Sequence, residues 1–210
     1  KGPLALSLNQ GGGLVRLSEE SQGPDLQLYF SPVSYTRAPV GARPLMSPDP
    51  FQGFLMGFNP CKPTSVGHLQ IKSPDPFVAP ELHPNYLDTE HDRALMIAGT
   101  RLLRRIAQTD ALRAVIETEL LPGADTQSDA AIGEYIKKEA WTVFHQCSTC
   151  RMGRDPGAAV VDPQLKVHGL DGLRIADASV FPTIPTGNTN APAIMIGEKA
   201  SDLILQSTKV

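Results

Sequence analysis

The spacing of apolar and polar residues divides the chain into successive patterns. From residue 11 to residue 72, short runs alternate apolar and polar positions, which is typical of strands with one buried face. Such runs predict strands at residues 13–17, 26–30, 54–58 and 66–72. Turn-forming residues separate the runs, so we expect an antiparallel sheet.

A long stretch at residues 31–52 interrupts this region with many prolines and glycines and no apolar period. A loop of this length inside a domain is often a functional surface or a lid. A plain irregular connection explains the composition equally well. The pattern leaves both interpretations open.

The apolar period becomes helical from Asp88 onward. Apolar or small residues recur every three to four positions at Leu95, Gly99, Leu102 and Ile106. This period predicts a helix with Asp88 as its N-cap.

Two shorter helices are expected at residues 111–120 and 128–140. Arg101, Arg104 and Arg105 lie off the apolar face of the preceding helix. Arginines can bind phosphate, but a solvated helix face explains them better in a chain with an acidic total.

The last third of the chain has a different pattern. Short apolar runs at residues 160–161, 165–167 and 173–176 are separated by turn sequences and predict short strands. A final helix is expected near the end of the chain, with Asn190 as its N-cap and Pro192 in its first turn.

The composition argues against several functional classes of protein. The chain has 210 residues, of which 41% are hydrophobic and 20% charged, with a net charge of −3. This is an ordinary globular composition, and it disfavours nucleic-acid binding through a basic surface. The longest uncharged stretch, residues 178–197, contains several prolines, so we expect no transmembrane helix. An odd number of cysteines disfavours a disulfide framework and indicates a cytoplasmic protein, with peripheral membrane association left open.

The densest cluster of chemically active residues is at positions 145–153, which read His-Gln-Cys-Ser-Thr-Cys-Arg-Met-Gly. His145, Cys147 and Cys150 have the spacing of metal ligands, and the two cysteines could form a redox dithiol. A complete zinc site would need Cys61 or His168 as a fourth ligand. Burial of these side chains in the core is a further alternative.

A second cluster follows the last predicted strand. Asp177, Ala178 and Ser179 form a turn of small residues, and residues 187–190 lead into the final helix. Backbone N–H groups in such a turn, together with the positive end of a helix, suit an anionic cofactor.

Both clusters belong to a longer pattern. Val-Val-Asp-Pro occupies residues 160–163, Val-His-Gly-Leu-Asp-Gly-Leu-Arg-Ile-Ala-Asp-Ala-Ser occupies 167–179, and Gly-Asn-Thr-Asn-Ala-Pro-Ala-Ile-Met-Ile-Gly-Glu-Lys occupies 187–199. Together with His145, this order closely resembles the C-terminal signature of the glucose-methanol-choline (GMC) flavoprotein oxidoreductases. The choline dehydrogenase-like branch fits best.

The resemblance implies an α+β chain with an α/β part. Residues 1–140 would form the substrate-binding part, an antiparallel sheet with packed helices. Residues 141–210 would be the catalytic and FAD-contacting segment, with the closing strand and final helix of a Rossmann-like FAD domain. The Gly-x-Gly-x-x-Gly turn of that domain does not occur here. We therefore expect an N-terminal FAD-binding half outside this chain, docking on a hydrophobic face around Ile175, Ile194 and Leu203.

The resemblance also implies an activity, the FAD-dependent oxidation of an alcohol to an aldehyde or ketone. The family's histidine near flavin N5 falls on His145, and its second active-site position falls on Asn188. We therefore expect these two side chains to lie side by side. Imidazole titrates near neutral pH and suits a base, and an amide can hydrogen-bond the substrate oxygen. Phe144 would line the substrate pocket.

The cofactor contacts implied by the resemblance involve four residues. The backbone of Asp177 and Ala178 would contact the FAD pyrophosphate, and Thr189 and Asn190 would face the pyrimidine edge of the flavin. No metal is expected, and Cys147 and Cys150 should be reduced thiols.

This chain departs from the common Pro-Val-Gly of the family at Gln146, Cys147 and Ser148. Two alternatives to the oxidoreductase remain at this point. One is a zinc or thiol protein that uses His145, Cys147 and Cys150. The other is a non-catalytic remnant or interaction module.

Overall fold

The computed structural model describes residues 9–36 and 47–207, and the chain divides into two compact units. Unit 1 contains the described residues up to Pro60 together with Ala94–Ala140. Unit 2 contains Cys61–Arg93 and the described residues from Trp141 onward. Antiparallel strand pairs and helices make up the units, which confirms the predicted α+β fold.

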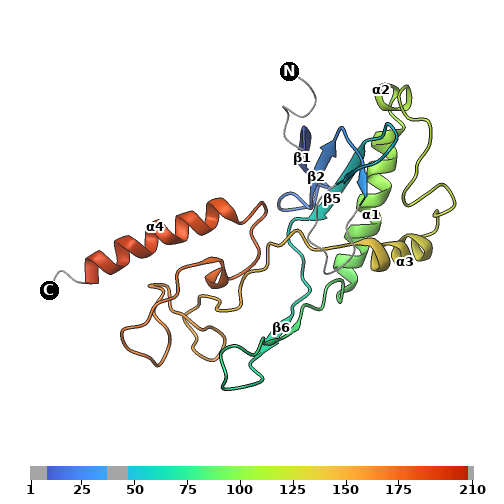
Figure 1. Ribbon diagram of the computed structural model, residues 1–210. Coiled ribbons are helices and arrows are strands. Elements are labelled where there is room, and N and C mark those ends of the chain that lie inside the picture. Colours follow the sequence, from blue (N-terminus) through green and yellow to red (C-terminus); the bar gives the residue numbers. More distant parts are fainter. Residues whose placement is uncertain (1–8, 37–46, 208–210) are drawn as a thin grey trace. The chain divides into compact units, whose positions relative to one another are not determined.

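The main sheet lies in unit 1 and consists of β1 (Gly11–Val15), β2 (Leu26–Ser31) and β5 (Leu55–Pro60). The strands are antiparallel in the order β1-β2-β5 (Figure 1). The apolar alternation predicted all three strands, and their ends differ from the expected ones by at most two residues.

Helix α1 (Glu90–Ala107) packs against this sheet at Gly99 (Figure 1). A Cβ atom added to Gly99 would lie 2.2 Å from Phe58 Cε2 of β5. Only a glycine therefore allows this close approach of the helix to the aromatic ring.

The α1 helix begins one residue later than expected. The Thr89 carbonyl accepts a hydrogen bond from Arg93 N (3.3 Å), and the Thr89 hydroxyl accepts one from Asp92 N (3.3 Å). Thr89 is therefore the N-cap, and the prediction of Asp88 was wrong because the Thr89 hydroxyl reaches the third helical N–H.

Asp92 is a buried carboxylate, only 2% exposed, in the first turn of α1. Its oxygens accept hydrogen bonds from Thr64 N (2.8 Å), Thr64 Oγ1 (3.1 Å) and Ser65 N (2.9 Å). Burial alone would raise the pKa of this carboxyl, but the hydrogen bonds from Ser65 and Thr64 outweigh burial and hold the pKa below its usual value. The ionised carboxylate thus joins segment 61–65 to the helix start.

The ends of the long loop after β2 are joined by a short pair of strands. β3 (Tyr35–Thr36) pairs with β4 (Ser47–Pro48). Residues 37–46, the centre of the predicted lid or connection, lie outside the described residues. Both interpretations of that loop therefore stay predictions.

A small hairpin in unit 2 consists of β6 (His68–Gln70) and β7 (Glu81–His83). The strand predicted at residues 66–72 is thus shorter than expected. A Cβ on Gly67 would lie 2.3 Å from the His83 carbonyl oxygen. The two backbones are thus in close contact next to the last pair of the hairpin, His68 with His83.

The helix predicted at residues 111–120 was wrong beyond its first turn. Helix α2 (Asp110–Arg113) has four residues, and most of residues 114–127 form turns and irregular backbone. Helix α3 (Asp129–Glu139) then begins as expected, with the Ser128 hydroxyl accepting a hydrogen bond from Ala131 N at 3.1 Å.

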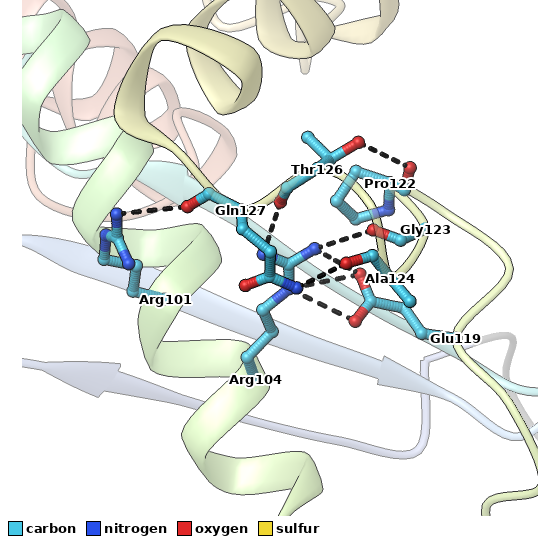
Figure 2. Close-up of polar contacts among 8 residues, drawn as sticks. All are labelled: Arg101, Arg104, Glu119, Pro122, Gly123, Ala124, Thr126 and Gln127. Carbon is cyan, nitrogen blue, oxygen red and sulfur yellow. Dashed lines mark hydrogen bonds and ion pairs between the residues drawn. The ribbon is translucent and has the colours of Figure 1, made fainter.

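Arg104 of α1 anchors the irregular segment that follows α2 (Figure 2). Its guanidinium donates to both carboxylate oxygens of Glu119 at 2.8–3.2 Å. It also donates to the carbonyls of Gly123 (3.0 Å) and Thr126 (2.7 Å). These hydrogen bonds stabilise the irregular backbone at residues 119–126 through long-range contacts that a local helical pattern does not contain.

The last third contains isolated bridges where short strands were predicted. Single bridges join Met152 to Val161, Val161 to Val167, and Lys166 to Arg174. The prediction of regular strands at residues 160–161, 165–167 and 173–176 was therefore wrong. Leu165, Gly169 and Gly172 have positive φ angles, and these turns leave too few extended residues between them for a ladder.

The core of unit 2 forms between this segment and helix α4 (Asn190–Ser207). Its buried members are Val161, Leu165, Val180, Phe181, Ile196 and Ala200. Ile175 and Leu203 pack against the same core. Of the three residues predicted to mark a hydrophobic docking face, Ile175 and Leu203 are thus half-buried, whereas Ile194 is 59% exposed. No helix in the described part of the chain is long and apolar enough to cross a membrane.

Candidate active site

The segment after His145 runs alongside the short 3₁₀ helix η2 (Ala178–Val180), which precedes α4. Three backbone N–H groups donate to successive carbonyls, namely Ser148 to Ala178 (3.3 Å), Cys150 to Ser179 (2.9 Å) and Met152 to Val180 (2.9 Å). This parallel pairing connects two distant stretches of sequence. It holds the loop at residues 141–148 in the unit that also contains the start of α4.

His145 and Asn188 are in direct contact. Asn188 Nδ2 lies 2.8 Å from His145 Nε2, although 43 positions separate the residues in sequence. The predicted juxtaposition of these side chains is thereby confirmed. The imidazole is half-buried and the amide is exposed, so the pair is accessible from one side.

Thr189 contacts the other ring nitrogen of the same histidine. Its Oγ1 lies 3.2 Å from His145 Nδ1, and its carbonyl accepts the helical hydrogen bond from Ala193 N at 3.0 Å. Thr189 is therefore the N-cap of α4, and Asn190, which was expected to be the cap, is the first helical residue. The helix start thus positions Asn188 and Thr189 against one imidazole.

The backbone on both sides of His145 has unusual conformations. Phe144 and Ser148 have φ angles of 60° and 70°, in the left-handed region that favours glycine. The family signature that this sequence resembles commonly has glycine at the position of Ser148, which agrees with this conformation. At Phe144 the conformation accompanies a side chain that is 73% exposed, in edge contact with Trp141 at a centroid distance of 6.4 Å. The two rings form an exposed aromatic pair beside His145.

Gln146 connects this loop to a second segment of unit 2. Its amide nitrogen donates to the Tyr86 hydroxyl (2.6 Å) and to Thr142 Oγ1 (2.8 Å). Gln146 was expected only as a departure from the signature that the sequence resembles, and Tyr86, Thr142 and Trp141 were not expected at the site. Trp141 and Thr142 lie close to His145 in sequence, which was an available signal, whereas nothing in the sequence linked Tyr86 to this loop.

The carboxylate of Asp177 caps the η2 turn. Asp177 Oδ1 accepts a hydrogen bond from Ser179 N at 2.7 Å. Among residues 9–36 and 47–207, no acceptor is found for the backbone N–H groups of Asp177 and Ala178. These two adjacent donors remain available to an acceptor outside the chain.

The cysteines near the site have a different environment from that of a metal centre. Cys61, Cys147 and Cys150 are free thiols, and Cys147 packs against the core of unit 2 with its Sγ 3.4 Å from Ser148 Oγ. Within the described residues, no group of three or more histidine, cysteine, aspartate or glutamate side chains could hold a metal ion. The zinc alternative therefore lacks a ligand set in this part of the chain.

Comparison with known proteins identifies relatives of this chain. The family model described as GMC oxidoreductase matches residues 63–197. The chain is 37% identical over 210 residues to an oxygen-dependent choline dehydrogenase of Staphylococcus saprophyticus, covering 97% of this chain and 36% of that protein. It is 40% identical over 195 residues to an oxygen-dependent choline dehydrogenase of Cronobacter sakazakii, covering 93% of this chain and 34% of that protein. The chain thus spans about a third of the length of the curated relatives it matches.

The chain also matches solved structures of oxidases. Pyridoxine 4-oxidase from Mesorbium loti matches with a TM-score of 0.73 and 30% identity over 88% of this chain and 35% of that protein. A formate oxidase matches with a TM-score of 0.79 and 27% identity over 89% of this chain and 32% of that protein. Another matching structure, of the formate oxidase from Aspergillus oryzae, concerns the modification of FAD in that enzyme. This match supports FAD as the cofactor.

The family match covers more than half of the chain, and it includes His145, Asn188 and the start of α4. The predicted resemblance and the choline dehydrogenase-like likeness are confirmed by these relatives. The chain belongs to the GMC oxidoreductase family.

Proposed function

We propose that this chain is the C-terminal part of an FAD-dependent oxidoreductase that acts on CH–OH groups and converts an alcohol to an aldehyde or ketone. The observation that carries the proposal is the 2.8 Å contact between Asn188 Nδ2 and His145 Nε2. A base and an amide at this separation can both reach one substrate oxygen.

In this proposal, His145 acts at the hydroxyl group of the substrate. Its Nε2 accepts the hydroxyl proton as the carbon–hydrogen bond breaks. The Asn188 amide donates a hydrogen bond to the same oxygen, which stabilises negative charge on that oxygen during proton removal. Phe144 lines the substrate pocket, because its exposed ring lies next to His145 in sequence.

The residues present fit a flavin cofactor. The unpaired N–H groups of Asp177 and Ala178 suit the pyrophosphate, and Thr189 and Asn190 at the start of α4 suit the polar edge of the flavin ring. When bound, FAD supplies the acceptor atom, N5, for the hydride of the alcohol. The protein chain supplies the proton acceptor and the hydrogen bonds.

We further propose a division of roles along the chain. Residues 1–140 form the substrate-binding part, and residues 141–210 form the catalytic and FAD-contacting segment. The outward face of α4 supports docking of an N-terminal FAD-binding half, since Ile194 and Met195 are 59% and 55% exposed. Apolar side chains this exposed on one helix favour a covering partner.

Choline is the first alcohol to test, because the curated relatives at 37–40% identity are named choline dehydrogenases. The experiment is anaerobic mixing of the intact FAD-loaded protein with choline and other primary alcohols. Loss of flavin absorbance measures hydride transfer directly. We expect His145→Ala to lower the rate constant of flavin reduction by about 10²- to 10⁴-fold.

The matched control is His91→Ala, which removes an exposed histidine of α1. This variant should reduce flavin at the wild-type rate. A wild-type rate in His145→Ala would contradict the proposed role of His145. A flavin that no alcohol reduces in the wild-type protein would contradict the proposed reaction.

A further inference from the structure

Both nitrogens of the His145 ring have side-chain partners from two consecutive residues. Asn188 Nδ2 lies 2.8 Å from Nε2, and Thr189 Oγ1 lies 3.2 Å from Nδ1. A neutral imidazole carries one proton, so one ring nitrogen must donate and the other must accept. The partners therefore determine which tautomer is stable.

The two partners together favour one tautomer. The NH₂ group of asparagine can donate but not accept a hydrogen bond, so Nε2 opposite Asn188 Nδ2 must be the acceptor. The ring proton then resides on Nδ1. The Thr189 hydroxyl, which can accept as well as donate, accepts the hydrogen bond from Nδ1–H.

The start of α4 explains why the Thr189 hydroxyl is available for this role. An N-cap hydroxyl usually accepts from the N–H of the second or third helical residue. The third helical residue here is Pro192, which has no N–H. With that donor missing, Thr189 Oγ1 turns to His145, while the Thr189 carbonyl keeps its helical hydrogen bond to Ala193 N.

We infer that Thr189 is a positioning residue that fixes His145 in its Nδ1–H tautomer, with the lone pair of Nε2 directed to the side of Asn188. The inference rests on the proposed function, since Nε2 is the proposed proton acceptor. In the opposite tautomer Nε2 carries a proton and can accept none. Thr189 thus acts through His145 without itself contacting the substrate.

The test compares Thr189→Val with Thr189→Ser in the intact protein labelled with ¹⁵N-histidine. Valine keeps the shape of threonine and removes the hydroxyl, whereas serine retains the hydroxyl. Long-range ¹H–¹⁵N spectra at about pH 8.5, where an ordinary imidazole is neutral, distinguish the two tautomers. The resonances missing from His145→Gln identify His145.

We expect the Nδ1–H tautomer in wild type and Thr189→Ser. In Thr189→Val the Nδ1–H donor has no acceptor, so we expect a clear shift towards the Nε2–H tautomer, with the Asn188 amide turned so that its Oδ1 accepts from Nε2–H. The loss of one hydrogen bond to the ring should lower kcat of Thr189→Val about tenfold, with recovery in Thr189→Ser. The melting temperature of Thr189→Val should fall by only a few degrees, because the hydroxyl caps no helical N–H and one hydrogen bond contributes about 1 kcal/mol.

Three results would overturn the inference. They are an Nε2–H tautomer in wild type, an unchanged tautomer in Thr189→Val, or a tautomer shift with unchanged kcat while His145→Ala is inactive. Failure of the proposed function has a separate signature, which is full activity of His145→Ala. In that case the spectra alone still decide whether Thr189 sets the tautomer.

Discussion

Helices α1 and α4 have the same length, 18 residues each, and opposite surface chemistry. α1 has acidic residues in its first turn and basic residues in its last, which complement the helix dipole. Its arginines contact acidic partners within the chain, including Arg101 with Asp129 and Arg104 with Glu119. α4 has no charged residue in either end turn and exposes apolar side chains. The comparison shows that the charged ends of α1 find partners within this chain, whereas α4 keeps apolar side chains exposed and follows directly after Asn188.

The largest stability effect is expected at the charged side of α1. Arg104→Met removes the guanidinium hydrogen bonds to Glu119 and to the carbonyls of Gly123 and Thr126 (Figure 2). Because the Arg104 side chain is only 20% exposed, we expect a loss of about 2–4 kcal/mol in the free energy of unfolding, measured by urea denaturation.

The matched control is Arg113→Met in the exposed pair with Asp110. That pair should contribute less than about 0.5 kcal/mol. Equal effects of the two substitutions would contradict the view that Arg104 organises residues 114–127.

A smaller effect is expected on the outward face of α4. If a partner covers this face in the intact protein, Ile194→Ser should lower its free energy of unfolding by about 2 kcal/mol. Arg105→Ser, at an exposed position of α1, should change it by less than about 0.5 kcal/mol. A neutral Ile194→Ser would show that the face stays solvent-exposed.

The smallest effect concerns the pH dependence of stability at the start of α1. Since the folded pKa of Asp92 lies below its ordinary value, its contribution to stability is complete above the unfolded pKa of about 3.9. This contribution is lost as the pH falls through the folded pKa. Asp92→Asn should cost about 1–2 kcal/mol at neutral pH and flatten the decline of stability below about pH 4.

Glu90→Gln provides the comparison, because the Glu90 side chain is 85% exposed. It should retain the wild-type decline in acid. Parallel acid profiles of wild type and Asp92→Asn would contradict a stabilising role of the buried carboxylate.

The fold could be predicted where local pattern and tertiary packing agree. Alternation located β1, β2 and β5, and the helical period located α1, α3 and α4. The pattern failed at residues 114–120, which lead into a segment that Arg104 holds by hydrogen bonds to Glu119 and to backbone carbonyls 19 and 22 positions away. Periodicity contains no information about such long-range bonds.

The candidate site could be predicted in part from family resemblance. His145 and Asn188 were expected to meet, and they do. The contact of Thr189 with His145 Nδ1 and that of Gln146 with Tyr86 were not foreseen. These contacts depend on side-chain direction in loops, which residue spacing does not determine.

The most direct test of the central claim is a double-mutant cycle on the rate constant of flavin reduction in the intact protein. The claim is that His145 and Asn188 act together on one substrate oxygen, so their losses should not multiply. We expect the variant carrying both His145→Ala and Asn188→Ala to reduce flavin within about threefold of the rate of His145→Ala alone. A double variant whose loss equals the product of the two single losses would contradict the claim.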